Sequence, residues 1–451
     1  MLGGLLQVFV AGRAIALGPH EIVVLVNRNR ADSGRIADAY ARMRAIPTVN
    51  VIDLNIPAAF TGERPEIAPA AFTEHIWEPV QTAMRERGIE SHILAWVYSA
   101  GFPIRVTTQP ATSIHAMTFT RNEIPSTQKT LDGTFSSPYF AGPNNPKAPE
   151  QGSQSLDRLV AWQGAAFPIP SMMLGYTGER GNSEAEILAY LRKGAAADHT
   201  SPTGTIFFTT SDDIRSTSRE WQYPRTVKDL AARGVGAVVT HVQSRNCPEV
   251  LGIMMGAAGI NAARNNTFLP GAMAEHFTSY AAAFDRKAQS KLSAWLSVGA
   301  SASAGTVTEP RAMWTKFPHA RFFVHYASGC TMLESFYQSI RCPMQILLVG
   351  DPLANPFAPD DRLAIEGLDG DSVAGLQTVR ARVTKGIPER YRRFLYLVDG
   401  RPQGERSRRR MVELDTTRLS NGRHVLRAIG YRNGTVRTQI FALKTFVVAN
   451  P

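Results

Sequence analysis

Short apolar runs alternate with helical patterns from residue 21 onward, and this alternation constrains the fold more than any other feature. The first run, EIVVLVN (21–27), is almost wholly aliphatic, as strands of a parallel sheet are when both faces are buried. Asp32 and Ser33 are placed to cap a helix that continues to about residue 44. The next predicted elements are a strand at 49–56, a helix at 72–87 and a strand at 92–99. This β-α-β-α-β order predicts a doubly wound, mostly parallel α/β sheet with right-handed crossovers.

Residues 103–170 interrupt this rhythm with many Pro, Gly, Ser, Thr and Asn residues and little periodicity. A structureless loop of this length is uncommon inside a compact domain, and is more often a functional lid or an insertion than a plain connection. The alternation then resumes, with predicted strands at 204–210, 235–242, 250–256, 322–326 and 345–350 and predicted helices at 183–197, 219–233, 290–297 and 328–340. We therefore expect one α/β domain over 21–357, with 103–170 as its long loop.

The pattern changes after Asp351 and Pro352. Period-two segments are separated by Asp-Gly and Asn-Gly pairs, which fit tight hairpin turns. The segments are 378–384, 392–398 and 424–431, and the turns are 399–400, 421–422 and 433–434. These features predict an all-β, immunoglobulin-like sandwich over 358–451. The phrase LDTTRLSNGRHVLRAIGY resembles the strand-turn-strand of such modules on secreted bacterial proteins, which are usually spacers or binders.

The length and the net charge of the chain limit the classes of function that it can have. A chain of 451 residues exceeds what one hydrophobic core usually serves, which agrees with two domains. No internal run approaches the roughly 18 apolar residues that a membrane-spanning helix needs. The net charge is +11, and the basic surplus concentrates between Asp371 and Arg410. Because no zinc-ligand spacing or aromatic RNA-binding signature accompanies this surplus, we interpret it as a solvated basic face and disfavour nucleic-acid binding. Attachment to an acidic surface polymer is the further alternative.

The first residues have features of an export signal. MLGGLLQVFVA (1–11) is an apolar stretch of suitable length, and Ala14-Ile15-Ala16 fits the small-x-small cleavage pattern. No Lys or Arg precedes the stretch, and Arg13 lies between it and the cleavage site. Either the start codon is placed too late or the signal is weak, and a buried N-terminal strand is the alternative. We assign 1–20 to a truncated signal peptide and expect a periplasmic or secreted protein.

Several phrases together resemble one bacterial family, of unassigned activity, from genomes that also encode exosortase, a membrane enzyme tied to protein sorting and exopolysaccharide production. The phrases are VLVNRNRADSGRIADAYARMRAIPTVNVIDLNIP, VYSAGFPIRV, FLPGAMAEHFTSYAAAF, WLSVGASASAGTVTEP and YASGCTMLESFYQSIRCPMQILLVGDPLANPF. They span roughly 22–357 in the expected order. The resemblance implies export and a role at the cell envelope, and it implies no particular reaction.

A more distant likeness is to the gingipain-type cysteine peptidases, which have the caspase-like fold; a flavodoxin-like sheet is the alternative. In those peptidases a His-Gly pair ends one strand and a nucleophilic Cys ends the next. The same order here places Thr240-His241 or Met255-Gly256 near the histidine position, and Thr278-Ser279 near the cysteine position. No Cys stands at the second position, so the resemblance implies a degenerate active site.

Ser279 is one candidate nucleophile, with His276 or His241 as its base. His276 precedes Ser279 by three residues, so the two side chains share a face in a helix and lie on opposite faces in a strand. A serine hydroxyl is a weak nucleophile without a well-placed base. The alternative is that Thr278 and Ser279 hydrogen-bond the backbone of a turn.

Cys330, in SGCTMLESF, is the other candidate nucleophile. We expect it in the first turn of the helix at 328–340, where the helix N-terminus favours the thiolate, with His325 as a possible base. A buried, inert Cys is the alternative. The helix would separate Cys330 from Cys342 by about 18 Å, which is too far for a disulfide. Cys247 is expected on an exposed loop.

Four carboxylates follow strand-like or turn segments and are candidate ligands of a divalent cation, since hard cations prefer oxygen. They are Asp212, Asp213, Glu309 and Asp351. Helix capping and turn formation are the alternatives. GYTGERG (175–181) lacks the Gly-x-Gly-x-x-Gly order, so no dinucleotide cofactor is expected.

These observations predict an exported, non-catalytic or degenerate peptidase-like protein that binds a polysaccharide or a sorted surface protein. The alternative is an active hydrolase that uses Cys330 or Ser279 beneath the loop at 103–170.

Overall fold

The computed structural model describes residues 10–11, 16–163, 167–262, 265–404 and 407–451. The predicted signal peptide therefore falls mostly outside the described residues. Val10–Ala11 form a short strand, β1, paired antiparallel with β21 (Gln439–Val448). Among the helices in the described ranges, none has both the length and the apolarity needed to cross a bilayer.

Ten strands form one sheet in the order β10-β9-β11-β12-β13-β14-β8-β5-β2-β3. In chain order they are β2 (Ile22–Asn27), β3 (Val51–Leu54), β5 (Ala95–Tyr98), β8 (Ser171–Met173), β9 (Thr205–Thr209), β10 (Gly236–Thr240), β11 (Val250–Gly256), β12 (Phe268–Phe277), β13 (Ala302–Thr306) and β14 (Ile346–Gly350). Every neighbouring pair is parallel except β13 and β14. The predicted mostly parallel α/β sheet is confirmed, and it consists of two parallel halves that run in opposite directions.

Small residues allow close packing at the junction of the halves. Strand β13 reads ASAGT and is buried throughout. A Cβ placed on Gly305 would lie 2.7 Å from the Ala281 side chain, so no larger residue fits there. The sequence pattern does not predict this antiparallel junction, because the direction of a strand leaves little mark on its composition.

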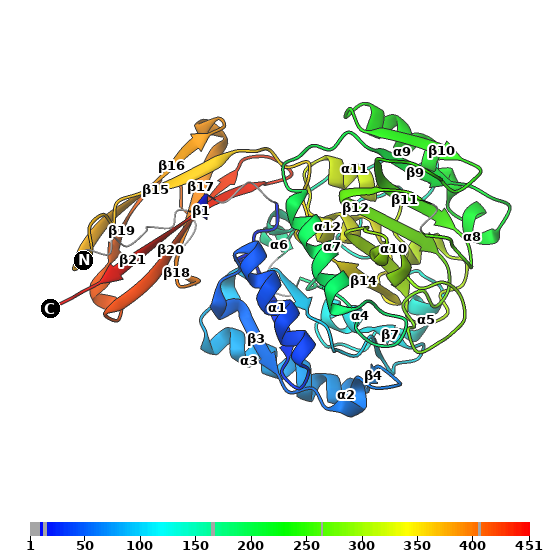
Figure 1. Ribbon diagram of the computed structural model, residues 1–451, viewed down its shortest axis with the longest axis horizontal. Coiled ribbons are helices and arrows are strands. Elements are labelled where there is room, and N and C mark those ends of the chain that lie inside the picture. The colour runs from blue at the N-terminus through cyan, green and yellow to red at the C-terminus, as the bar shows by residue number, and fades with distance from the viewer. Residues whose placement is uncertain (1–9, 12–15, 164–166, 263–264, 405–406) are drawn as a thin grey trace.

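The helices cover both faces of the sheet, and α1 and α7 lie side by side on one of them (Figure 1). They are α1 (Ala31–Arg44), α2 (Pro69–Phe72), α3 (Glu78–Glu86), α4 (Ile114–Phe119), α5 (Thr127–Leu131), α6 (Leu156–Gln163), α7 (Glu184–Ala196), α8 (Ile214–Thr217), α9 (Tyr223–Ala231), α10 (Ser293–Ser297), α11 (Phe322–Ala327) and α12 (Met332–Ser339). A π-helical turn at 73–77 joins α2 to α3. Helix α7 begins with a capping box between Ser183 and Glu186. The predicted cap of α1 is wrong: the N-cap is Arg30, and Asp32 lies within the first turn.

Two other predictions fail in this domain. The segment FFVHY is helix α11 and not a strand, because a short, mainly apolar run fits a buried helix equally well. The segment 103–170 contains strands β6 (Arg105–Val106) and β7 (Thr112–Ser113) and helices α4, α5 and α6. All six residues of α4 are buried, so this part packs into the core and is not a lid.

The strands after residue 357, together with β1, form two antiparallel sheets, which lie to the left of the α/β body in Figure 1. One has the order β1-β21-β20-β17-β18 and the other β15-β16-β19. Their strands are β15 (Arg362–Glu366), β16 (Leu376–Lys385), β17 (Tyr391–Val398), β18 (Arg401–Pro402), β19 (Met411–Asp415), β20 (Gly422–Arg432) and β21. One apolar core joins the two sheets, with Val379 from one and Phe394 and Ile440 from the other.

The predicted turns behave differently from one another. Asp399-Gly400 connects β17 to β18, and both residues have positive φ, as a tight hairpin requires. Asn421-Gly422 instead leads from β19 into β20, which belong to different sheets, so no hairpin forms there. The sheets also contact the α/β body: Gln439 donates a hydrogen bond to Glu21 at 2.6 Å, and Arg437 pairs with Asp157 at 3.2 Å.

Candidate functional site

Strand β2 lies between β3 and β5, so the chain passes from β2 to β3 and then returns past β2 to β5. Ligands of open α/β sheets bind at such a reversal, beyond the carboxyl ends of the strands. Asn27, at the end of β2, donates a hydrogen bond to the carbonyl of Gly101, in the loop after β5, at 2.5 Å. Gly101 has φ +77°, and a Cβ there would lie 2.9 Å from Cγ of Arg30. The two strand ends are therefore held together closely.

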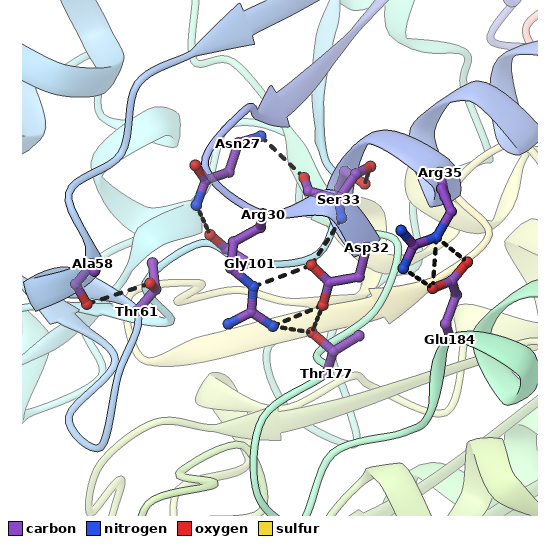
Figure 2. A network of polar contacts seen from close by, with 11 residues as sticks. Asn27, Arg30, Asp32, Ser33, Arg35, Ala58, Thr61, Gly101, Thr177 and Glu184 are labelled. Carbon is purple, nitrogen blue, oxygen red and sulfur yellow. Dashed lines mark hydrogen bonds and ion pairs between the residues drawn. The ribbon is translucent and has the colours of Figure 1, made fainter.

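A polar network fills this position (Figure 2). Arg30 donates two hydrogen bonds to the carboxylate of Asp32, at 3.1 and 2.7 Å. Thr177, from the loop after β8, donates to the same carboxylate at 2.6 Å. Burial alone would raise the pKa of Asp32, but the hydrogen bonds from Arg30 and Thr177 outweigh it and lower the pKa to about 2. The carboxylate of Asp32 is therefore ionised, and its hydrogen bonds hold it in a fixed position at the carboxyl edge of the sheet.

A pocket of about 1030 Å³ lies among the neighbouring loops, and we call it the loop pocket. Its lining comes from the loop after β3 (61–66), from Arg105, from the loop after β8 (176–180) and from 284–287, after β12. Tyr176 and Phe284 stack with ring centroids 4.2 Å apart and fix the last two segments against each other. Strands β3, β5 and β8 belong to the same parallel half, so three of the four segments extend from one edge of the sheet.

Arg105 organises one wall of the loop pocket. It binds both carboxylate oxygens of Asp285, at 2.8 and 2.6 Å, and it pairs with Glu66 at 2.9 Å. Burial tends to raise the pKa of Asp285, but the hydrogen bonds from Arg105 lower it below its usual value. A bidentate pair of this kind holds two loops in one geometry.

Other charges in the loop pocket are exposed. Within the described part of the chain, no ion pair joins Arg64, Arg286 or Lys287 to a carboxylate, and all three side chains are exposed. Arg286 lies over the ring of Tyr280, with its guanidinium carbon 4.6 Å from the centroid. Glu63 and Glu179 also line the pocket. The lining is mainly charged and polar, and it suits a hydrophilic ligand.

His276, the predicted base, lies on β12 and is fully buried. Trp295 donates its indole N–H to Nδ1 at 3.0 Å, and Nε2 lies 3.2 Å from the carbonyl of Ser290, which places the imidazole proton on Nε2. Burial lowers the pKa of His276 to about 4. Both ring nitrogens are thus occupied, and the imidazole has no free nitrogen for Ser279.

Ser279 instead donates a hydrogen bond to the carboxylate of Glu309 at 2.9 Å. The structure therefore brings together one predicted nucleophile and one predicted metal ligand. His241, the other predicted base, is exposed and lies 2.8 Å from the hydroxyl of Thr210. In the described part of the chain, His241 and Ser279 form no hydrogen bond with each other.

Cys330 is fully buried between α11 and α12, and the N-cap of α12 is Thr331. The Cys330 thiol therefore precedes the helix and does not lie in its first turn. Its contacts are the carbonyl of Gln154 at 3.6 Å and the amide of Gln338 at 3.4 Å. Burial raises the pKa of the Cys330 thiol well above its usual value. His325 contacts the hydroxyl of Ser153 at 2.9 Å, and burial lowers the pKa of His325 to about 3.

Two of the other predicted metal ligands, Asp213 and Asp351, have separate protein partners. Asp213 caps α8 and pairs with Arg215 at 3.0 Å, as its capping alternative predicts, and Asp212 is exposed. Asp351 is fully buried and accepts hydrogen bonds from Tyr40 at 2.9 Å and from Arg44. In the described residues, no group of three or more His, Cys, Asp or Glu side chains is arranged to hold a metal ion. Cys247, Cys330 and Cys342 are all free thiols.

No local sequence pattern predicts the loop pocket. Its loops are breaks between predicted elements, and GYTGERG resembles only an incomplete dinucleotide motif. The pairing of Arg105 with Asp285 joins residues 180 positions apart, so no local pattern marks it.

The described residues define a mixed α/β protein with a large, mostly parallel sheet and separate antiparallel sheets. No protein-family model matches the chain, and comparison with curated proteins gives no match. Among solved structures, a lytic polysaccharide monooxygenase from Jonesia denitrificans is 16% identical in sequence, with a TM-score of 0.14. The match covers 22% of this chain and 64% of that protein, which is less than two thirds of its length. An endo-β-1,4-mannanase from Thermotoga petrophila shares 14% identity over 59% of this chain and 50% of that one, with a TM-score of 0.16.

The spore cortex lytic enzyme SleM from Clostridium perfringens shares 9% identity over 78% of this chain and 92% of that one, with a TM-score of 0.17. Because all three TM-scores are this low, none of these proteins indicates the fold or the function of this chain.

Proposed function

We propose that this chain is a non-catalytic binding protein whose ligand site is the loop pocket. The observation that carries the proposal is the composition of the pocket. Among the described residues, Arg64, Arg286 and Lys287 are exposed there without carboxylate partners, and the described lining contains no Ser, Cys or His. A volume of about 1030 Å³ corresponds to several sugar units or a short peptide rather than a single small metabolite.

The chemistry of the lining favours a hydroxyl-rich ligand with acidic groups. Guanidinium and ammonium groups donate hydrogen bonds and bind carboxylates, and they accept none. The preformed Arg105–Asp285 pair keeps the wall rigid, which lowers the entropy lost on binding. An acidic polysaccharide fits this lining best, and a sorted surface protein is the alternative ligand.

The wider setting is part of the same proposal. We infer export to the cell envelope from the family resemblance and from the apolar stretch at 1–11. We also infer that the sheet is a caspase-like or flavodoxin-like variant with a degenerate active site, and that residues 358–451 are an immunoglobulin-like module. The resemblance to the exosortase-associated family supports a link to exopolysaccharide or surface-protein sorting.

The rival function is a hydrolase that uses Cys330 or Ser279. The contacts of these residues weigh against it: the Cys330 thiol is buried with a raised pKa, and Ser279 faces a carboxylate. A hydrolase with these nucleophiles requires a base within about 3 Å of each, and the neighbouring imidazoles have other partners.

A reactivity profile separates the two functions. The purified chain is treated with an iodoacetamide probe and, separately, with a fluorophosphonate probe, and labelled peptides are identified by mass spectrometry, folded and after unfolding. We expect Cys247, which is half-buried, to react in the folded protein, and Cys330 and Ser279 to remain unlabelled. Labelling of Cys330 or Ser279 only in the folded state would establish the hydrolase.

A further inference from the structure

A second pocket, of about 140 Å³, lies where the antiparallel sheets meet α6, and five arginines line it. We call it the arginine pocket. Among the described residues, the arginines are Arg392, Arg393, Arg408, Arg432 and Arg437, and Asp157 is the carboxylate in the lining. A concentration of like charges on one small surface is unfavourable unless an anion neutralises it.

The strand pairing explains why the arginines converge. Strand β17 begins beside the end of β20, where Arg393 pairs with Tyr431 and Tyr391 pairs with Arg432. An isolated bridge between Phe394 and Ser407 brings Arg408 to the same place. The backbone N–H of Asn433 donates to the carbonyl of Arg390 at 2.7 Å, which fixes the turn that leads to Arg437. The cluster is therefore built by the fold and does not depend on flexible side chains meeting by chance.

The carboxylate in the lining is already engaged. Asp157 pairs with Arg437 at 3.2 Å and accepts a hydrogen bond from Ser155 at 2.7 Å. In the described part of the chain, no ion pair joins Arg392, Arg393, Arg408 or Arg432 to a carboxylate. Arg392 donates a hydrogen bond to the backbone carbonyl of Glu389 at 3.4 Å. Among the residues that the structure describes, these four guanidinium groups therefore line the pocket without a carboxylate partner.

We propose that the arginine pocket binds a multiply charged oxyanion, a phosphate or sulfate group, that is either free or carried on a polymer. The size supports this, because about 140 Å³ holds one such group with its waters and is too small for a sugar ring with its neighbours. The residue type supports it as well. Every cation among the described lining residues is arginine, whose planar fork donates paired hydrogen bonds to phosphate-like oxygens and stays charged at all accessible pH values.

This site is independent of the proposed function of the loop pocket, because the two pockets share no lining residue. Substitutions in one leave the other intact, so either proposal can fail alone.

The test is titration calorimetry of the full-length chain with inorganic phosphate and, separately, with dextran sulfate. The variant is the double substitution Arg393→Gln and Arg432→Gln, which removes two charges from the pocket. Arg423→Gln is the matched control: it lies on β20 as Arg432 does, is exposed, and is outside the pocket. Thermal unfolding checks that each variant is folded, and Arg392→Gln with Arg408→Gln replaces the first pair if it is not.

We expect the double variant to bind at least tenfold more weakly than the wild type, and Arg423→Gln to bind as the wild type does. If dextran sulfate binds more than a hundredfold more tightly than phosphate and the double variant abolishes this, the group is carried on a polymer. If phosphate binds as tightly as dextran sulfate, the ligand is the free anion. Unchanged binding in the double variant, equal weakening in the control, or no binding of either probe would overturn the proposal.

Discussion

The hydroxyl of Ser279 donates a hydrogen bond to the carboxylate of Glu309 at 2.9 Å, and Glu309 also accepts the backbone N–H of Arg311 at 2.8 Å. Ser279 follows β12 and Glu309 follows β13, so the contact joins the ends of two neighbouring parallel strands. The sequence suggests Ser279 as a nucleophile and Glu309 as a metal ligand. In the structure the two residues form a contact between loops.

This contact can be measured with a double-mutant cycle of Ser279→Ala and Glu309→Ala. Because the contact is exposed, we expect a coupling free energy of about 0.5–1 kcal/mol in the free energy of unfolding. Urea unfolding of the four proteins gives the value. Additive effects of the two substitutions would show that the contact contributes nothing in solution.

The buried state of His276 predicts a pH dependence. Its pKa is about 4 when folded and near the ordinary 6.5 when unfolded, so neutral His276 stabilises the fold above pH 6.5, and this contribution is lost as the pH falls towards 4. His276→Asn keeps an acceptor for Trp295 without the titration. We expect the destabilisation caused by His276→Asn to be smaller at pH 5 than at pH 7, by about 2 kcal/mol.

Urea unfolding of the wild type and of His276→Asn at the two pH values measures this difference. Contributions of other buried groups, such as Glu275 and Glu334, are common to both proteins and cancel in the comparison. A destabilisation that does not change with pH would mean that His276 titrates normally and is accessible to water.

Substitution of Asp351 tests whether its carboxylate has a structural role or binds a metal ion. Its carboxylate accepts hydrogen bonds from Tyr40 and Arg44 and is fully buried. Asp351→Ala removes one of the two carboxylates that neutralise the buried guanidinium of Arg44, and only Asp198 remains. We therefore expect a loss of about 3–5 kcal/mol in the free energy of unfolding. Calcium and a chelator should leave the melting temperature of the wild type unchanged. A rise in melting temperature with calcium that Asp351→Ala abolishes would identify Asp351 as a metal ligand.

The sequence predicted the features that local patterns encode. The strand IVVLVN, helices α1 and α7 and the Asp399-Gly400 hairpin follow from apolar runs and turn residues. It could not distinguish helix α11 from a strand, since a short apolar run is compatible with both. Contacts between distant residues, such as Arg105 with Asp285, have no local signal, and for this reason both pockets were visible only in the structure.

The most direct test of the binding role is titration of the full-length chain with a galacturonic acid oligomer and with a neutral cello-oligosaccharide. The variant is Arg64→Gln with Lys287→Gln, both exposed in the loop pocket, and Arg423→Gln is the control. We predict that the acidic oligomer binds the wild type and the control equally and the double variant at least tenfold more weakly, while the neutral oligomer does not bind. Equal binding of the acidic oligomer to the wild type and the double variant, or no binding to either, would contradict the account.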